Sequence, residues 1–152
     1  MKQRKIFSRF FNEQGRQYSL TDMAKFMAAF YFDMRTVHFC TTGNDFYTYH
    51  QLAEELYTIA EMYYDDLIET AIGYDEEIKP MFVIPEAWCN IQASDISGAE
   101  TEEIISKSLM QIFDKLESIA KGKYSSFVYS KIDSMLEYFD KEIYKIKQNA
   151  KN

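Results

Sequence analysis

The stretch HFCTTGNDFYTYH, residues 38–50, joins two long segments of helical character and contains the only two histidines of the 152-residue chain. Gly43 and Asn44 lie near its middle, and both residue types adopt turn conformations at low cost. Because the turn is short, the segments on either side are expected to form an antiparallel helical hairpin. His38 would then end the first helix and His50 would begin the second, so the hairpin would bring both side chains to one end.

Apolar residues recur at spacings of three and four in four segments, which is the pattern of amphipathic helices. Ser19 or Thr21 is expected to cap the first helix, and Gly73 is expected to follow the last turn of the second. Ser97 and Glu100 form a capping box at the start of the third. The expected helices are residues 19–41, 45–72, 97–119 with the capping box included, and 125–147.

The links between these helices predict how they pack. The first and third links are short, whereas residues 73–97 form a long link that holds both prolines and the only tryptophan. Two hairpins joined by one long connection is a ferritin-like arrangement. The expected fold class is therefore all-α, a ferritin-like four-helix bundle with a long crossover between helices 2 and 3. The bundle is expected over residues 19–150, after an N-terminal arm at residues 1–18.

The composition agrees with one helical domain. Hydrophobic residues make up 47% of the chain, too many for a disordered protein, while five glycines and two prolines are too few for a turn-rich β-sandwich. The net charge of −7 disfavours nonspecific nucleic-acid binding by the folded domain and is compatible with attracting cations. Two cysteines, no long apolar span and no secretory leader predict a cytoplasmic protein without membrane contact.

The second helix has two faces when its residues are placed at intervals of about 100°. The apolar core stripe consists of Leu52, Leu56, Ile59, Tyr63 and Leu67. On the other face His50 and Glu54 are one turn apart, and Asp65 and Glu69 form a second pair one turn apart. The two pairs are separated by about 16 Å along the helix axis, so no single ion can bridge them.

Two copies of this helix, crossing antiparallel about a two-fold axis, would remove that separation. The histidine end of one subunit would meet the Asp65 and Glu69 end of its mate, and symmetry would create two identical sites. His38, from the preceding helix, can lean over the same place. Imidazole and carboxylate ligands together suit Fe(II), Zn(II) or Mn(II). The expected metal-binding and catalytic residues are His38, His50, Glu54, Asp65 and Glu69.

The histidines and the carboxylates can each be explained without a bound metal. The histidines can be imidazoles satisfied by hydrogen bonds in a core or interface, and the carboxylates can belong to a solvated helix face. Tyr57 and Tyr64 lie beside the acidic stripe, where they can be redox-active or simply pack. No ExxH motif occurs in the chain, so the intrasubunit di-iron centre of large ferritins is not indicated.

The candidate ligands follow the pattern His, eleven residues, His, three residues, Glu, ten residues, Asp, three residues and Glu. This pattern resembles that of the Dps (DNA-binding protein from starved cells) mini-ferritin family. Gly43, Phe46 and His50 match that family's approach to the second histidine, and the resemblance covers nearly the whole chain after residue 18. It implies a hollow dodecamer of two-fold dimers with ferroxidase centres at the two-fold interfaces. The function it implies is oxidation of Fe(II) by hydrogen peroxide or O2, iron storage and protection against oxidative damage, with Zn2+ or Mn2+ able to replace iron.

Two positions depart from the family pattern. Glu54 stands where the family usually has Asp, which keeps the donor type and adds one methylene. Phe39 stands where a tryptophan often follows the first histidine. The alternative function is therefore a ferritin-like cage or interaction protein that assembles through the same faces and oxidises iron weakly or not at all.

The N-terminal arm also has two explanations. Its basic residues could hold DNA, with avidity from many copies, and they are Lys2, Arg4, Lys5, Arg9 and Arg16. Its apolar residues could instead pack on the shell, and they are Ile6, Phe7, Phe10 and Phe11. Packing is favoured over DNA binding because the chain as a whole is acidic.

Overall fold

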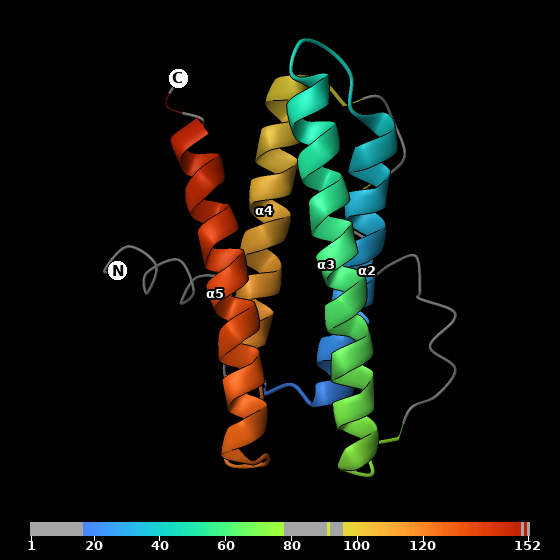
Figure 1. Cartoon of the computed structure of the whole chain (residues 1–152), viewed down its shortest axis with the longest axis vertical. Coiled ribbons are helices and arrows are strands. Elements are labelled where there is room, and N and C mark those ends of the chain that lie inside the picture. Colours follow the sequence, from blue (N-terminus) through green and yellow to red (C-terminus); the bar gives the residue numbers. More distant parts are fainter. Residues whose placement is uncertain (1–16, 78–90, 92–95, 150, 152) are drawn as a thin grey trace.

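The computed structural model describes residues 17–77, 91, 96–149 and 151, and within these ranges the secondary structure is four helices. They are α2 (Leu20–Cys40), α3 (Phe46–Gly73), α4 (Gly98–Glu117) and α5 (Ser126–Asn149), arranged side by side as a bundle (Figure 1). Over the described residues the predicted all-α architecture with four long helices is confirmed, with helix ends within a few residues of those expected. The basic and apolar residues of the N-terminal arm up to residue 16 lie outside the described residues.

The helices form two antiparallel hairpins. In Figure 1, α2 and α5 run upward while α3 and α4 run downward. At the upper end the amide of Thr42 donates to the carbonyl of Ile96 at 2.9 Å, and the amide of Ile96 donates to the carbonyl of Cys40 at 2.9 Å. These two bonds hold the start of α4 beside the link between α2 and α3. The last residues after α3 lie at the opposite end, so α3 ends far from where α4 begins.

The ends of α2 and α3 follow local rules with one exception. Ser19, one of the two residues predicted to cap the first helix, caps α2 and also forms a capping box with Asp22. Gly43 has a φ of 97°, the left-handed conformation that a turn glycine adopts easily. The placement of Gly73 beyond the second helix is wrong, because α3 includes Gly73 and the left-handed residue is Asp75, with a φ of 55°. Aspartate tolerates this conformation better than most residues, so the turn does not require glycine.

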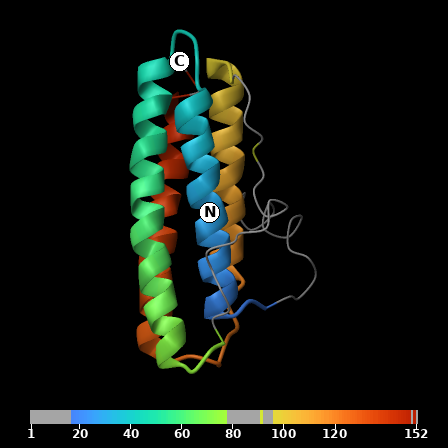
Figure 2. The same ribbon diagram turned by 90° about the vertical axis from the view of Figure 1, so that its right-hand side faces the viewer.

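The core lies between the two hairpins, with α2 packed against both α3 and α4 (Figure 2). Fully buried side chains come from all four helices and include Met27, Leu56, Leu109 and Phe139. Phe30 and Phe139 join α2 to α5 through an edge-to-face contact with ring centroids 5.4 Å apart. None of the helices in the described ranges is long and apolar enough to cross a membrane.

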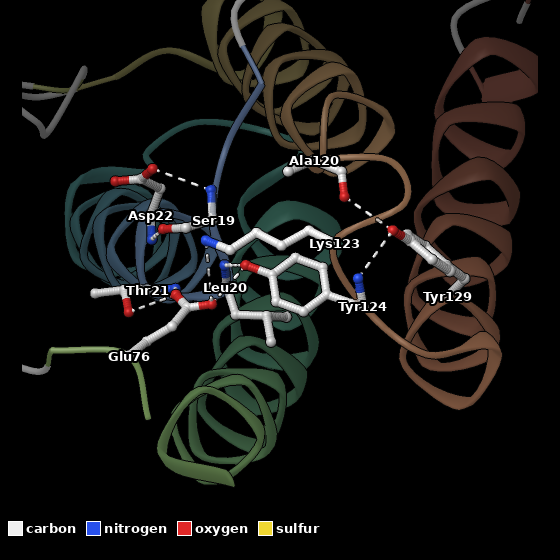
Figure 3. Close-up of polar contacts among 9 residues, drawn as sticks. All are labelled: Ser19, Leu20, Thr21, Asp22, Glu76, Ala120, Lys123, Tyr124 and Tyr129. Carbon is white, nitrogen blue, oxygen red and sulfur yellow. Dashed lines mark hydrogen bonds and ion pairs between the residues drawn. The ribbon is translucent and has the colours of Figure 1, made fainter. Parts of the chain in front are cut away.

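A buried carboxylate joins three elements at the lower end of the bundle (Figure 3). Glu76, just after α3, accepts hydrogen bonds from the amide of Thr21 at 3.0 Å, from the Thr21 hydroxyl at 2.9 Å and from the Tyr124 hydroxyl. The Tyr124 hydroxyl in turn accepts from the amide of Leu20 at 2.9 Å. The Glu76 carboxylate therefore satisfies the amide of Thr21 directly and is linked to the amide of Leu20 through Tyr124. Both amides lie in the first turn of α2, where negative charge is favoured.

The ionisation of this cluster follows from its hydrogen bonds. Burial works to raise the pKa of Glu76, but the bonds from Tyr124 and Thr21 and the charge of Lys123 outweigh it and leave the pKa lowered. Burial and the Glu76 carboxylate raise the pKa of Tyr124. Glu76 is therefore ionised and Tyr124 protonated near neutral pH, which is the state in which their bond forms.

Candidate metal centre

The two histidines lie in contact at the upper end of the bundle, where α2 passes into α3. Their rings are stacked, with centroids 3.7 Å apart and planes at 23°. The Nδ1 atom of His38 lies 3.1 Å from the carbonyl oxygen of His50, and the Nδ1 atom of His50 lies 2.8 Å from the carbonyl oxygen of His38. A carbonyl oxygen only accepts, so each Nδ1 donates its proton to the backbone of the other residue.

These reciprocal bonds set the tautomer of both neutral rings. With the proton on Nδ1, the Nε2 atom carries the lone pair that can bind a metal. A hydrogen bond from the other ring nitrogen to a carbonyl is the usual support of a metal-binding histidine, because it fixes ring orientation and tautomer. Within the described ranges neither Nε2 atom has a hydrogen-bond partner. Each ring is therefore held as the Nδ1–H tautomer, and Nε2 is the nitrogen left to accept a proton or bind a ligand.

Aromatic rings enclose the histidine pair. The ring of Phe46 stacks on His50 with centroids 4.7 Å apart and planes at 28°. Tyr57 and Phe39 meet the His38 ring edge-on, at centroid distances of 5.4 and 5.3 Å. These contacts leave both imidazoles half-buried and restrict their rotation.

The guanidinium of Arg35 lies beside the histidine pair, against the rings of Tyr31, Phe39 and Tyr57. We name these four residues the aromatic shelf. The Arg35 guanidinium carbon is 4.8 Å from the Tyr57 ring centroid and 5.3 Å from that of Phe39. Its Nη1 atom donates to the Tyr31 hydroxyl at 3.4 Å. The ring faces attract the guanidinium and hold its charge in place. A metal cation bound by the histidines would therefore need nearby carboxylates to balance the local positive charge.

The three expected carboxylates, Glu54, Asp65 and Glu69, are all exposed on α3. No hydrogen bond or ion pair joins their side chains to any residue that the structure describes. The neighbouring Asp66 differs, because its carboxylate is bonded to Lys131 of α5. Tyr64, which is half-buried, has its pKa raised by burial and then by the charge of Asp65. The candidate ligands thus point to the outside of the hairpin, whereas Asp66 joins α3 to α5.

A single chain brings together only the two histidines. Asp65 lies fifteen residues after His50, which is about 22 Å along a helix axis. Across the described ranges, no group of three or more His, Cys, Asp or Glu side chains is placed to hold a metal ion within one chain. The five expected residues therefore fall into a histidine pair and a separate acidic stripe that consists of Glu54, Asp65 and Glu69.

Sequence reasoning missed three features of this region. It assigned no role to Arg35, it treated Phe46 only as part of a motif, and it did not foresee the reciprocal bonds to the backbone. The spacing of Tyr31, Arg35 and Phe39 at four-residue intervals on one helix was a usable signal, because such residues share a face. The backbone bonds had no sequence signal, since they depend on the turn geometry.

Comparison with known proteins gives one informative match. No family model matches the chain, and no solved structure matches it. The chain is 30% identical over 91 residues to general stress protein 20U of Bacillus subtilis (strain 168). The match covers 60% of this chain and 59% of that protein, so it spans less than two thirds of the relative.

Proposed function

We propose that this chain is a Dps-like mini-ferritin, which binds iron, oxidises Fe(II) with hydrogen peroxide or O2 and stores the ferric product. The observation that carries the proposal is the pair of His38 and His50, with both Nδ1 atoms bonded to the backbone and both Nε2 atoms without a partner among the described residues. Such support is characteristic of histidines that bind metal ions. Protection against oxidative damage would follow, because oxidation in a protein site removes both Fe(II) and peroxide.

The directions of the helices support a ferritin-like fold. Since α3 and α4 run the same way, the chain needs a long crossover between the two hairpins, as in ferritin-like bundles. The relative at 30% identity is named as a general stress protein, which is compatible with a role under oxidative stress.

The exposed face of α3 supports a two-fold dimer with shared sites. On a helical wheel with His50 at 0°, Tyr47, Met62 and Ile72 lie at about 60°, 120° and 40°. These side chains are 84%, 62% and 59% exposed, on the same stripe as the acidic residues. Large apolar side chains among carboxylates are typical of a surface that contacts another protein. An antiparallel mate would cover them and bring its Asp65 and Glu69 to the histidine pair.

In the proposed site, iron is the substrate and the protein supplies its ligands. The two Nε2 atoms bind Fe(II) as neutral donors, while the carboxylates of Glu54, Asp65 and Glu69 supply negative charge. Anionic oxygens stabilise Fe(III) more than Fe(II), so they favour loss of an electron to the oxidant. Glu69 would bridge toward a second, weaker iron position, from which oxidised iron leaves for the interior. Zn2+ or Mn2+ would compete for the same ligands.

A mixed-subunit experiment tests both the chemistry and the sharing of the site. One variant carries His38→Ala and His50→Ala, the other carries Asp65→Asn and Glu69→Gln, and each alone should lose Fe(II) oxidation. Co-expression should restore about a quarter of the wild-type rate, since half of the random dimers are mixed and each has one intact site. Stopped-flow Fe(II) oxidation by peroxide and by O2 provides the rates. Equal rates in wild type and the histidine variant would refute the proposal, and no recovery on mixing would refute the shared site.

Particle mass tests the assembly. Static light scattering after gel filtration should give about twelve times the 18.0 kDa subunit mass. A monomer or an isolated dimer would rule out storage in a shell.

A cage or interaction protein with little oxidation is the second candidate. It is favoured by the stack of Phe46, His50 and His38, because imidazoles packed between aromatic rings and bonded to the backbone also serve as structural groups. This function predicts the same particle mass with a rate of Fe(II) oxidation equal to that of the histidine variant.

A further inference from the structure

We infer that Glu102 of α4 is a positioning residue for the histidine pair, and that it acts through its hydrogen bond to Tyr49 of α3. The inference rests on the proposed metal binding and adds to it a residue that is not itself a ligand. The role of Glu102 would be to hold the start of α3 where the His50 ring stacks on His38.

The start of α3 has little local support of its own. Asp45 occupies the N-cap position, but its side chain makes no capping hydrogen bond. The first amides of a helix have no partner within the helix, so an end without a side-chain cap frays more easily. Phe46 and His50, whose rings stack, both belong to this part of α3. Fraying would therefore displace the His50 ring and also the His50 carbonyl, which accepts from His38.

The start of α4 supplies the support that the start of α3 lacks. The Tyr49 hydroxyl donates to the Glu102 carboxylate at 2.7 Å. Tyr49 directly precedes His50 and is only 3% exposed, so packing in the core already restricts its ring. The first turn of α4 is itself capped, because the amide of Ser97 donates to the Glu100 carboxylate at 3.0 Å. The bond between Tyr49 and Glu102 thus ties the uncapped end of α3 to a capped one.

A second connection between the same regions runs through the backbone. Ile96 donates to the carbonyl of Cys40 and accepts from the amide of Thr42, with both distances at 2.9 Å. Figure 1 shows the α2–α3 link and the start of α4 at the same upper end of the bundle. Ile96 therefore holds the end of α2, while Glu102 holds the start of α3. The histidine pair lies between these two attachments, so both help to set the distance between its rings.

Two substitutions in α4 separate the hydrogen bond from other effects of a charge on this helix. Glu103 is the matched control, since it is exposed and makes no hydrogen bond or ion pair with any residue that the structure describes. Glu103→Ala therefore removes the same charge from the next position. Glu102→Gln keeps an acceptor oxygen of the same shape, so it should retain the bond from Tyr49.

The test measures histidine tautomers and Co(II) affinity in the full chain carrying Glu102→Ala, Tyr49→Phe, Glu102→Gln or Glu103→Ala. Solid-state NMR of protein labelled with 15N at histidine reports which ring nitrogen is protonated, and the chain has only two histidines to assign. Spectra are taken at about pH 8, above the ordinary histidine pKa of about 6.5. Isothermal titration gives the Co(II) affinity, and urea denaturation gives the stability. A merely structural bond would change stability and leave the tautomers and the affinity of the folded protein unchanged.

In Glu102→Ala and Tyr49→Phe we expect a mixture of Nδ1–H and Nε2–H tautomers in place of the single Nδ1–H form. Co(II) binding should weaken by about tenfold, the lower end of the loss that follows removal of a supporting partner. Glu102→Gln and Glu103→Ala should match wild type. Tyr49→Phe, which removes only the hydroxyl, decides the question if Glu102→Ala does not fold.

Two outcomes separate this inference from the proposed function. Wild-type tautomers and wild-type affinity in both Glu102→Ala and Tyr49→Phe would refute the positioning role and leave the proposed function intact. If the wild type binds no Co(II), the proposed function fails, and the tautomers of wild type and variants still decide whether Glu102 positions the rings.

Discussion

The two ends of the α2–α3 hairpin use polar side chains in opposite ways. At the lower end, Glu76 is almost fully covered, with 9% of its side chain exposed, and its oxygens are occupied by Thr21 and Tyr124 of the same chain. At the upper end, His38 and His50 use only one ring nitrogen each, and both Nε2 atoms remain without a partner in the described residues.

This difference separates a structural cluster from a candidate functional one. Buried polar groups stabilise a fold when every donor and acceptor is satisfied within it. The lower end meets that condition and needs nothing further. At the upper end the histidines satisfy this condition only at Nδ1, and the carboxylates of the acidic stripe have no partner in the described part of the chain. The histidine end is therefore the candidate ligand site of the two.

The largest expected effect concerns metal binding. His38→Ala with His50→Ala should weaken Co(II) or Zn(II) binding by at least about a hundredfold, since loss of even a supporting partner costs tenfold or more. Isothermal titration provides the affinity. The same variant should keep its helical circular dichroism, and a collapse of the fold would show that the upper end is also structural.

Glu76→Ala should produce the opposite result. It removes an acceptor from buried donors of Thr21 and Tyr124, so unfolding free energy should fall by about 2 kcal/mol. Urea denaturation measures this loss. Glu137→Ala is the control, because its exposed pair with Lys141 is expected to contribute less than about 0.5 kcal/mol. Metal affinity should not change, and a parallel loss would mean that the two ends are coupled.

The cluster at the lower end should also contribute to the pH dependence of stability. The pKa of Glu76 is lowered in the folded protein, so its stabilisation is present above the ordinary value of 4.5 and lost as pH falls through the lowered value. Glu76→Gln lacks this titration. The stability difference between wild type and Glu76→Gln should therefore shrink from about pH 7 to about pH 3 in urea titrations. A difference that is constant with pH would contradict the assigned cause.

The smallest effects are expected at two glycines, Gly43 in the turn before α3 and Gly73 at the last position of α3. Gly43→Ala should cost about 1 kcal/mol, because an alanine at a φ of 97° is strained. Gly73→Ala should raise the free energy of unfolding by about 0.5 kcal/mol, because Gly73 is helical and an added Cβ meets nothing within 4 Å. Thermal unfolding measures both, and the same sign for both variants would contradict the different roles of these glycines.

Much of the fold could be predicted from local patterns. The apolar spacing predicts the four helices, and the position of Ser19 before that pattern predicts its role as a cap. The short link between the first two helices predicts the turn at Gly43. Gly73 was misplaced because a glycine near a helix end resembles a terminator, whereas the chain turns at Asp75. Hydrogen bonds of residues 74–76 back to α3 decided this, and sequence spacing does not reveal them.

The sequence by itself determined which helices form and which faces of α3 carry apolar or chemically active residues, because period and residue type are local properties. It also placed the two histidines at one end of a hairpin. Only the tertiary structure decided that His38 and His50 stack, that their Nδ1 atoms bond to each other's backbone, and that Arg35 and Tyr57 lie against them. These contacts depend on the angle and distance between α2 and α3, which arise from packing of the whole bundle rather than from either helix alone.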